Sequence, residues 1–130
     1  MRDLAAKKAY MSTRVKTSGP GNLVLMLHQG ALKFLNLAEK AIREDDYRCA
    51  HEYLVRTQDI IVEIRSSFSK DVDPELFGDL VSLYGYMHRR LIEANVKKDS
   101  EPIGEVRGML EQMHEAWGEV SRQMTAGGIV

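Results

Sequence analysis

The stretch SKDVDPELFGDLVSLYGYMHRRL, residues 69–91, contains a boundary between two elements and the start of a long helix. Asp73 is a good N-cap residue, Pro74 suits the first helical position because it lacks an N–H, and Glu75 complements the positive end of a helix. Apolar residues then recur every three or four positions, which is the spacing of one helical face. These residues are Leu76, Leu80, Leu83, Met87, Leu91 and Ala94. The stretch therefore predicts an amphipathic helix that begins at Pro74.

Three other segments show the same periodicity. The first is expected to begin near Pro20, with Gly19 as its N-cap, and the last to end at Gly127-Gly128. The candidate N-cap of the second segment is Asp45 or Asp46, and that of the last segment is Asp99 or Ser100. The apolar faces of the three segments comprise, in order, Leu23, Leu27, Ala31, Phe34, Ala38 and Ile42; Ala50, Leu54, Thr57, Ile61, Ile64 and Phe68; and Ile103, Val106, Leu110, Met113, Trp117, Val120 and Met124.

The connections between these segments are short, so successive helices are expected to run antiparallel. No segment alternates with the period of two that indicates a strand. We therefore predict an all-α protein, an antiparallel up-down four-helix bundle with a mobile N-terminal segment. The bundle domain is expected over residues 18–126 and the N-terminal segment over residues 1–17.

Composition narrows the class of protein. The chain has 130 residues, of which 44% are apolar, and a net charge of −1, so one domain is expected and nucleic-acid binding is not. Its single cysteine, Cys49, cannot form a disulfide framework, which is typical of a cytoplasmic protein. No run of about 20 apolar residues exists and the start does not resemble a signal peptide, so we expect no membrane insertion.

The sequence offers little for catalysis. It contains no glycine-rich phosphate loop, no nucleophile elbow and no distinctive pair of carboxylates, so we do not expect an enzyme or a cofactor. Di-iron bundles need two Glu-x-x-His motifs, and only Glu111-x-x-His114 matches. We therefore expect no metal site, and we expect the histidines to be surface or interfacial residues. His88, followed by two arginines, is a candidate for phosphotransfer. A histidine phosphotransfer or metal-binding helical bundle remains the alternative. The histidines are His28, His51, His88 and His114.

Residues 10–35 and 83–99 are more apolar than the surface of a small bundle requires. Tyr84 and Tyr86 cannot both face the core, because residues two apart on a helix diverge by about 200°. Methionine-rich and aromatic surfaces suit partners that must be accommodated flexibly. The pattern favours a protein that holds another polypeptide.

Three ordered motifs resemble the flagellin-specific export chaperone family FliS, from about Tyr10 to Val120. The first comprises Tyr10, Pro20, Leu23, Leu25, Met26, Leu27, Gly30, Ala31 and Phe34. The second comprises Ala50, His51, Glu52, Leu54, Gln58, Asp59, Ile60, Ile61 and Glu63. The third comprises Leu83, Tyr84, Tyr86, Met87, Arg89, Arg90, Leu91, Ile92, Glu93, Ala94 and Asn95. The chain departs from the family where Gly19 replaces a frequent serine and His28-Gln29 a frequent Tyr-Asp pair.

The resemblance implies a cytoplasmic, ATP-independent export chaperone that binds the C-terminal segment of flagellin and prevents premature polymerisation before secretion. It also implies that residues 1–17 act as a lid that the guest displaces. An interaction with the flagellar export gate is compatible with this role. The lid and guest surface is expected to include Tyr10, Val15, Ile61, Ile64, Tyr86, Met87 and Leu91.

Overall fold

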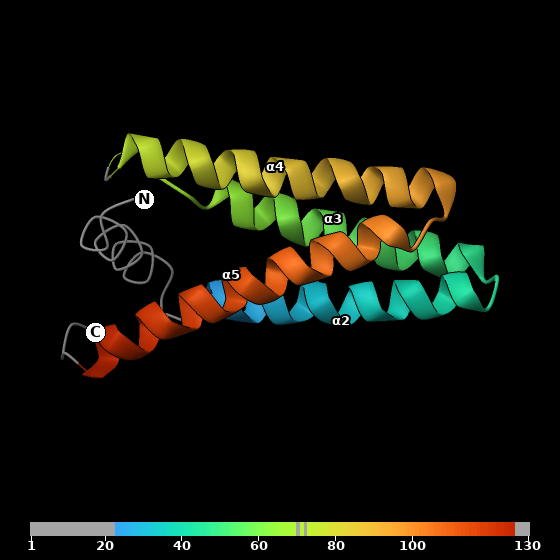
Figure 1. The fold of residues 1–130 in the computed structure, drawn as a ribbon, viewed down its shortest axis with the longest axis horizontal. Helices are drawn as coiled ribbons and strands as arrows, with labels where there is room; N and C mark the ends of the chain where they lie inside the picture. Colours follow the sequence, from blue (N-terminus) through green and yellow to red (C-terminus); the bar gives the residue numbers. More distant parts are fainter. Residues whose placement is uncertain (1–22, 70, 72, 127–130) are drawn as a thin grey trace.

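The computed structural model describes residues 23–69, 71 and 73–126, and these residues form four helices and no strand. The helices are α2 (Leu23–Arg43), α3 (Tyr47–Ser66), α4 (Pro74–Lys97) and α5 (Glu101–Ala126). Successive helices run in opposite directions (Figure 1), which confirms the predicted antiparallel all-α bundle. The expectations for Gly19, Pro20, the lid over residues 1–17 and the stop at Gly127-Gly128 lie outside the described residues.

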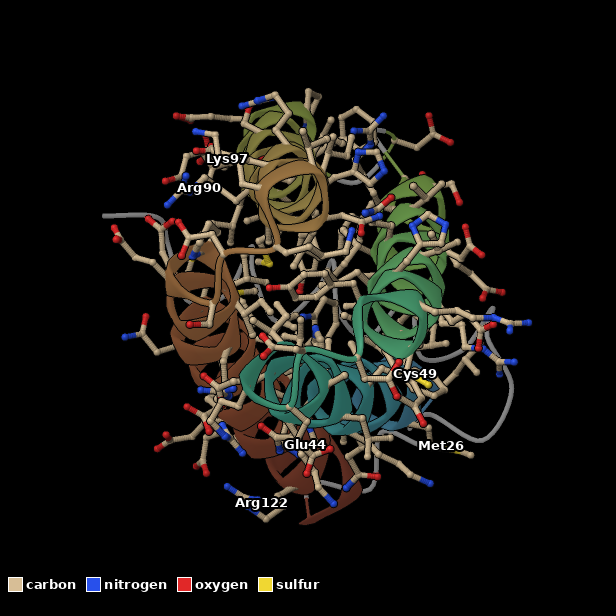
Figure 2. All side chains as sticks on the ribbon, turned by 90° about the vertical axis from the view of Figure 1, so that its right-hand side faces the viewer. Met26, Glu44, Cys49, Arg90, Lys97 and Arg122 are labelled. Carbon is tan, nitrogen blue, oxygen red and sulfur yellow. The ribbon has the colours of Figure 1, made fainter. Side chains whose placement is uncertain are left out.

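The four helices surround one core. Each helix packs on the helices that precede and follow it, and α2 packs on α5 to complete the ring. Figure 2 looks along the bundle and shows this arrangement end-on. Helix α5 runs obliquely to the others, and its C-terminal part extends beyond the start of α2 (Figure 1). None of the helices in the described ranges has both the length and the apolar character that crossing a bilayer requires.

The helix starts follow the caps that the sequence predicts. Asp46 and Asp73 each accept a hydrogen bond from the backbone N–H three residues further on, at 3.2 and 3.1 Å. Asp99 accepts one from the N–H two residues further on, at 3.0 Å. These bonds satisfy N–H groups that have no partner within the helix. Asp45 and Lys98 adopt positive φ angles of 57° and 51° and let the chain reverse at two of the turns.

The core faces of α3, α4 and α5 largely match the predicted ones, but the buried face of α2 matches only at Ala31 and Ala38. Leu23, expected inside, is 41% exposed, and Leu27 is only half-buried. The apolar arc of α2 is wide, so the periodicity alone does not fix which part of that arc faces inward. The buried residues of α2 are Val24, His28, Ala31, Leu35, Ala38 and Ala41.

Candidate functional site

Four of the residues expected on a partner surface lie in the core. Ile61, Ile64, Met87 and Leu91 are each 0% exposed and belong to the buried cluster that all four helices share. They present no surface to a partner in this structure, because their helices turn these positions toward the bundle axis. Their part in binding stays a prediction, as does that of Tyr10 and Val15, which lie outside the described residues.

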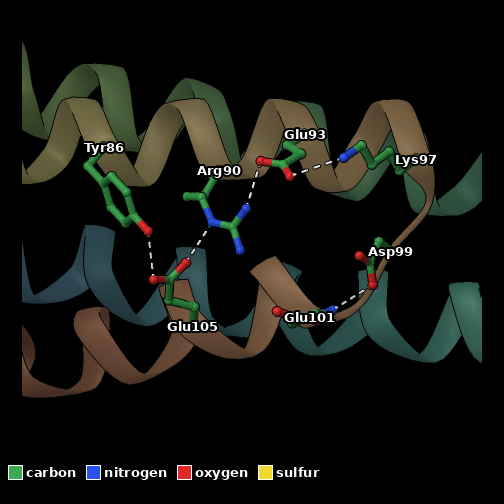
Figure 3. A network of polar contacts seen from close by, with 7 residues as sticks. All are labelled: Tyr86, Arg90, Glu93, Lys97, Asp99, Glu101 and Glu105. Atoms are coloured by element: carbon green, nitrogen blue, oxygen red, sulfur yellow. Dashed lines mark hydrogen bonds and ion pairs between the residues drawn. The ribbon is translucent and has the colours of Figure 1, made fainter.

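Tyr86, in contrast, lies on the outside of the bundle between α4 and α5. Its hydroxyl donates to Glu105 at 2.7 Å, and Arg90 donates to the same carboxylate at 2.6 Å (Figure 3). These two hydrogen bonds, from Tyr86 and then Arg90, lower the pKa of the Glu105 carboxyl. Arg90 also pairs with Glu93 at 2.6 Å, and Glu93 with Lys97 at 3.3 Å. The network joins α4 to α5 and holds Tyr86 in one orientation.

Tyr84 faces the other way, as the spacing of the two tyrosines predicts. It is completely buried, and its hydroxyl lies 2.7 Å from Nε2 of His28 on α2. Burial raises the pKa of the Tyr84 phenol. Burial, and then the nearby His114, lower the pKa of His28 to about 4, so this imidazole is neutral at pH 7. The expectation of a surface or interfacial histidine at position 28 is therefore wrong.

His28 belongs to an aromatic cluster near the start of α2. The ring of His114 lies edge-on to that of His28, with centroids 6.0 Å apart. Phe68 stacks on Trp117 with centroids 6.1 Å apart and contacts Tyr84 at 5.4 Å. Within the described chain, Nδ1 of His28, Nδ1 of His114 and Nε1 of Trp117 are buried without a hydrogen-bond partner. A buried polar group without a partner lowers the free energy of unfolding relative to an apolar group of the same shape.

A groove of about 420 Å³ lies beside this cluster, between the first turns of α2 and the C-terminal half of α5. Leu25 and Met26 supply apolar surface from α2, and Met26 is 57% exposed. Gly118 keeps the α5 wall low: a Cβ there would meet only the Arg122 side chain, at 3.5 Å. The groove is lined by Leu25, Met26, Gln29, His114, Glu115, Gly118 and Arg122. Figure 2 shows Met26 and Arg122 on the outside of the bundle.

One wall of this groove is partly indicated by the sequence. Leu25 lies off the predicted core face of α2, and the width of that apolar arc indicates either a central helix or a further contact. The opposite wall is formed by His114 and Gly118, which carry no such signal. Only the oblique packing of α5 brings them beside α2, so the groove could not be located before the fold was known.

The described residues provide no assembled centre for the alternative chemistry. No group of three histidine, cysteine, aspartate or glutamate side chains within the described ranges is arranged to hold a metal ion. His88, the candidate phosphotransfer residue, is half-buried on α4. Cys49 donates its backbone N–H to Asp46, and its thiol has a raised pKa, chiefly through a hydrogen bond with that carboxylate. A raised pKa keeps the thiol protonated and a poor nucleophile.

Apolar side chains remain exposed at two main places on the bundle. Leu23 and Met26 lie at the start of α2, beside the groove. Val62 on α3 and Ile92 and Val96 on α4 are 43%, 42% and 78% exposed. An antiparallel helical bundle with exposed apolar surface and an open groove is suited to holding another polypeptide.

Comparison with known proteins places the chain in such a class, the flagellar secretion chaperones. Residues 2–124 match the family described as "Flagellar protein FliS". The chain is 39% identical to the flagellar secretion chaperone FliS of Bacillus subtilis over 109 residues, covering 84% of this chain and 80% of that one. It is 32% identical to the Salmonella typhimurium protein of the same name, with 88% of each chain covered. The chain therefore belongs to the FliS family.

Proposed function

We propose that this protein is a cytoplasmic, ATP-independent chaperone that binds the C-terminal segment of flagellin and keeps it from polymerising before export. The observation that carries the proposal is the match to the FliS family over nearly the whole chain, with relatives named flagellar secretion chaperones. The open groove between α2 and α5 and the exposed apolar residues on both sides of the bundle support it. A guest that gains helix on such a surface buries its own apolar face.

We place the first guest contact in the groove between α2 and α5, with the lid of residues 1–17 over it in the free protein. Val15 precedes Leu23 by eight residues, which span at most ~29 Å when extended, so the lid can reach the adjoining groove. Tyr10 and Val15 are two apolar side chains of the lid that the guest would displace. The flagellar export gate would be a further partner, since a secretion chaperone must deliver its guest.

Calorimetry with the C-terminal segment of flagellin from the same organism tests the proposal. We expect one-to-one binding with a large negative heat-capacity change, because a folding apolar guest is buried. The full-length double variant Tyr10→Ser and Val15→Ser should bind more tightly, since a weaker lid competes less with the guest. Absence of binding by both proteins would overturn the function. Equal affinity would remove the lid and leave the guest assignment in place.

A further inference from the structure

Two arginines from neighbouring helices meet over a glycine on the outside of the α3–α4 pair. A Cβ added to Gly85 would lie 3.3 Å from a terminal nitrogen of Arg65 on α3 and 3.6 Å from one of Arg89 on α4. Gly85 is itself buried, and the absence of a side chain there lets both guanidinium groups lie close over its backbone.

Neither arginine has a partner for its charge within the described chain. Their side chains form no hydrogen bond or ion pair with any described residue. The sequence explains this for Arg65, because the positions three and four residues away on α3 and beyond carry no carboxylate. Glu93, one turn after Arg89, is already bonded to Arg90 and Lys97. Two positive charges held this close repel each other, and an anion between them relieves the repulsion.

Exposed apolar residues lie along the same face. Val62 precedes Arg65 by one turn of α3, and Ile92 follows Arg89 by one turn of α4, with Val96 a further turn on. All three are more than 40% exposed. The two helices pack on each other along their lengths, and His51 of α3 hydrogen-bonds Asn95 of α4 across the seam. The face thus combines an apolar strip with an unpaired double positive charge.

We propose that Arg65 and Arg89 form a carboxylate-binding site that receives an acidic side chain of an amphipathic guest segment lying along α3 and α4. The apolar strip selects a polypeptide over a free anion, because it needs an apolar surface to cover it. The paired guanidinium groups then fix the position of that segment through charge-assisted hydrogen bonds. This inference rests on the proposed function and names the chemistry of one part of the guest.

The test compares four full-length proteins with the wild type in calorimetry with the flagellin C-terminal segment: Arg65→Gln, Arg89→Gln, the double variant and Arg56→Gln. Arg56 is the matched control, since it is an exposed arginine of α3 that lies over the Phe34 ring of α2 instead. We expect about a tenfold weaker affinity for the double variant at low ionic strength, and a smaller loss at high salt. Arg56→Gln should stay within about twofold of the wild type.

The same titrations with each acidic residue of the flagellin segment changed to its amide identify the carboxylate. At least one such change should weaken binding to the wild type and have no further effect on the double variant. Wild-type affinity in the double variant, or full additivity at every acidic residue, overturns the carboxylate site while the chaperone function stands. Failure of the wild type itself to bind the segment overturns both.

Discussion

At the scale of single residues, the hydrogen bond between His28 and Tyr84 lies inside the bundle. It joins α2 to α4 through two side chains that are completely removed from water. A buried imidazole is tolerated here only in its neutral form, because burial and His114 oppose a positive charge at that position. The stability of this end of the bundle is therefore tied to the protonation of one ring.

The lowered pKa of His28 predicts acid sensitivity. The unfolded chain binds this proton near pH 6.5 and the folded chain only near pH 4, so the unfolded state carries more protons between these values. The contribution of neutral His28 to the free energy of unfolding is fully present above pH 6.5. It is lost as the pH drops through that window, by about 3 kcal/mol in all. Urea unfolding at pH 7, 6 and 5 should show a progressive loss in the wild type.

The variant His28→Gln separates this effect from other titrations, because an amide can still hydrogen-bond to Tyr84 but does not ionise. Its urea midpoint should change much less between pH 7 and 5. His51→Gln is the matched control, since His51 is exposed, and it should keep the wild-type pH dependence. If the urea midpoints of the wild type and His28→Gln changed equally with pH, His28 would not control the acid response.

At the scale of helices, the caps and the path of α5 set the geometry. Asp46 and Asp73 fix where α3 and α4 begin, and both turns are short. The oblique path of α5 opens the groove beside α2, and Gly118 keeps the α5 wall of that groove low. The helix positions thus determine where the surfaces lie, while the individual groove residues determine only the chemical character of those surfaces.

The cap of α3 gives a prediction at this scale. Asp46→Ala should lower the free energy of unfolding by about 1 kcal/mol, because the N–H of Cys49 loses its acceptor. Asp59→Ala, an exposed position within the same helix, should change it by less than about 0.5 kcal/mol. Urea unfolding at pH 7 measures both. A cost for Asp59→Ala as large as that for Asp46→Ala would show that capping is not the cause.

Helix boundaries and the all-α class were predictable because caps and periodicity are local signals. Asp46 and Asp73 act as N-caps where the sequence indicates them, and Tyr84 and Tyr86 diverge as their spacing requires. The exposed surface was not predictable in the same way. Ile61 and Met87 look the same in sequence whether an apolar face turns inward or outward, and only packing against three other helices decides it. The meeting of Arg65 and Arg89 likewise depends on how α3 and α4 align.

At the scale of the whole molecule, the bundle offers two surfaces on opposite pairs of helices. The groove lies between α2 and α5, and the carboxylate site lies on α3 and α4. A guest segment that occupies both must pass around the bundle. Binding at each surface can be followed separately.

Trp117, the single tryptophan, precedes Gly118 and follows His114 by one turn, and both of these line the groove, so a guest bound there should alter its surroundings. A tryptophan-free flagellin segment should change the emission of Trp117 on binding. The change should persist in the double variant Arg65→Gln and Arg89→Gln at saturating guest, because neither arginine lines the groove. Saturation by calorimetry without any change in emission would place the guest outside the groove.

The packing of α2 against α5 also determines when the groove can form during synthesis of the protein. Neighbouring helices can pack as soon as each pair has left the ribosome, since their contacts are local in sequence. The groove differs, because its two walls come from the first and the last described helix. It comes into existence only when synthesis has passed α5, so a nascent chain cannot hold a guest there until its last described helix has been made.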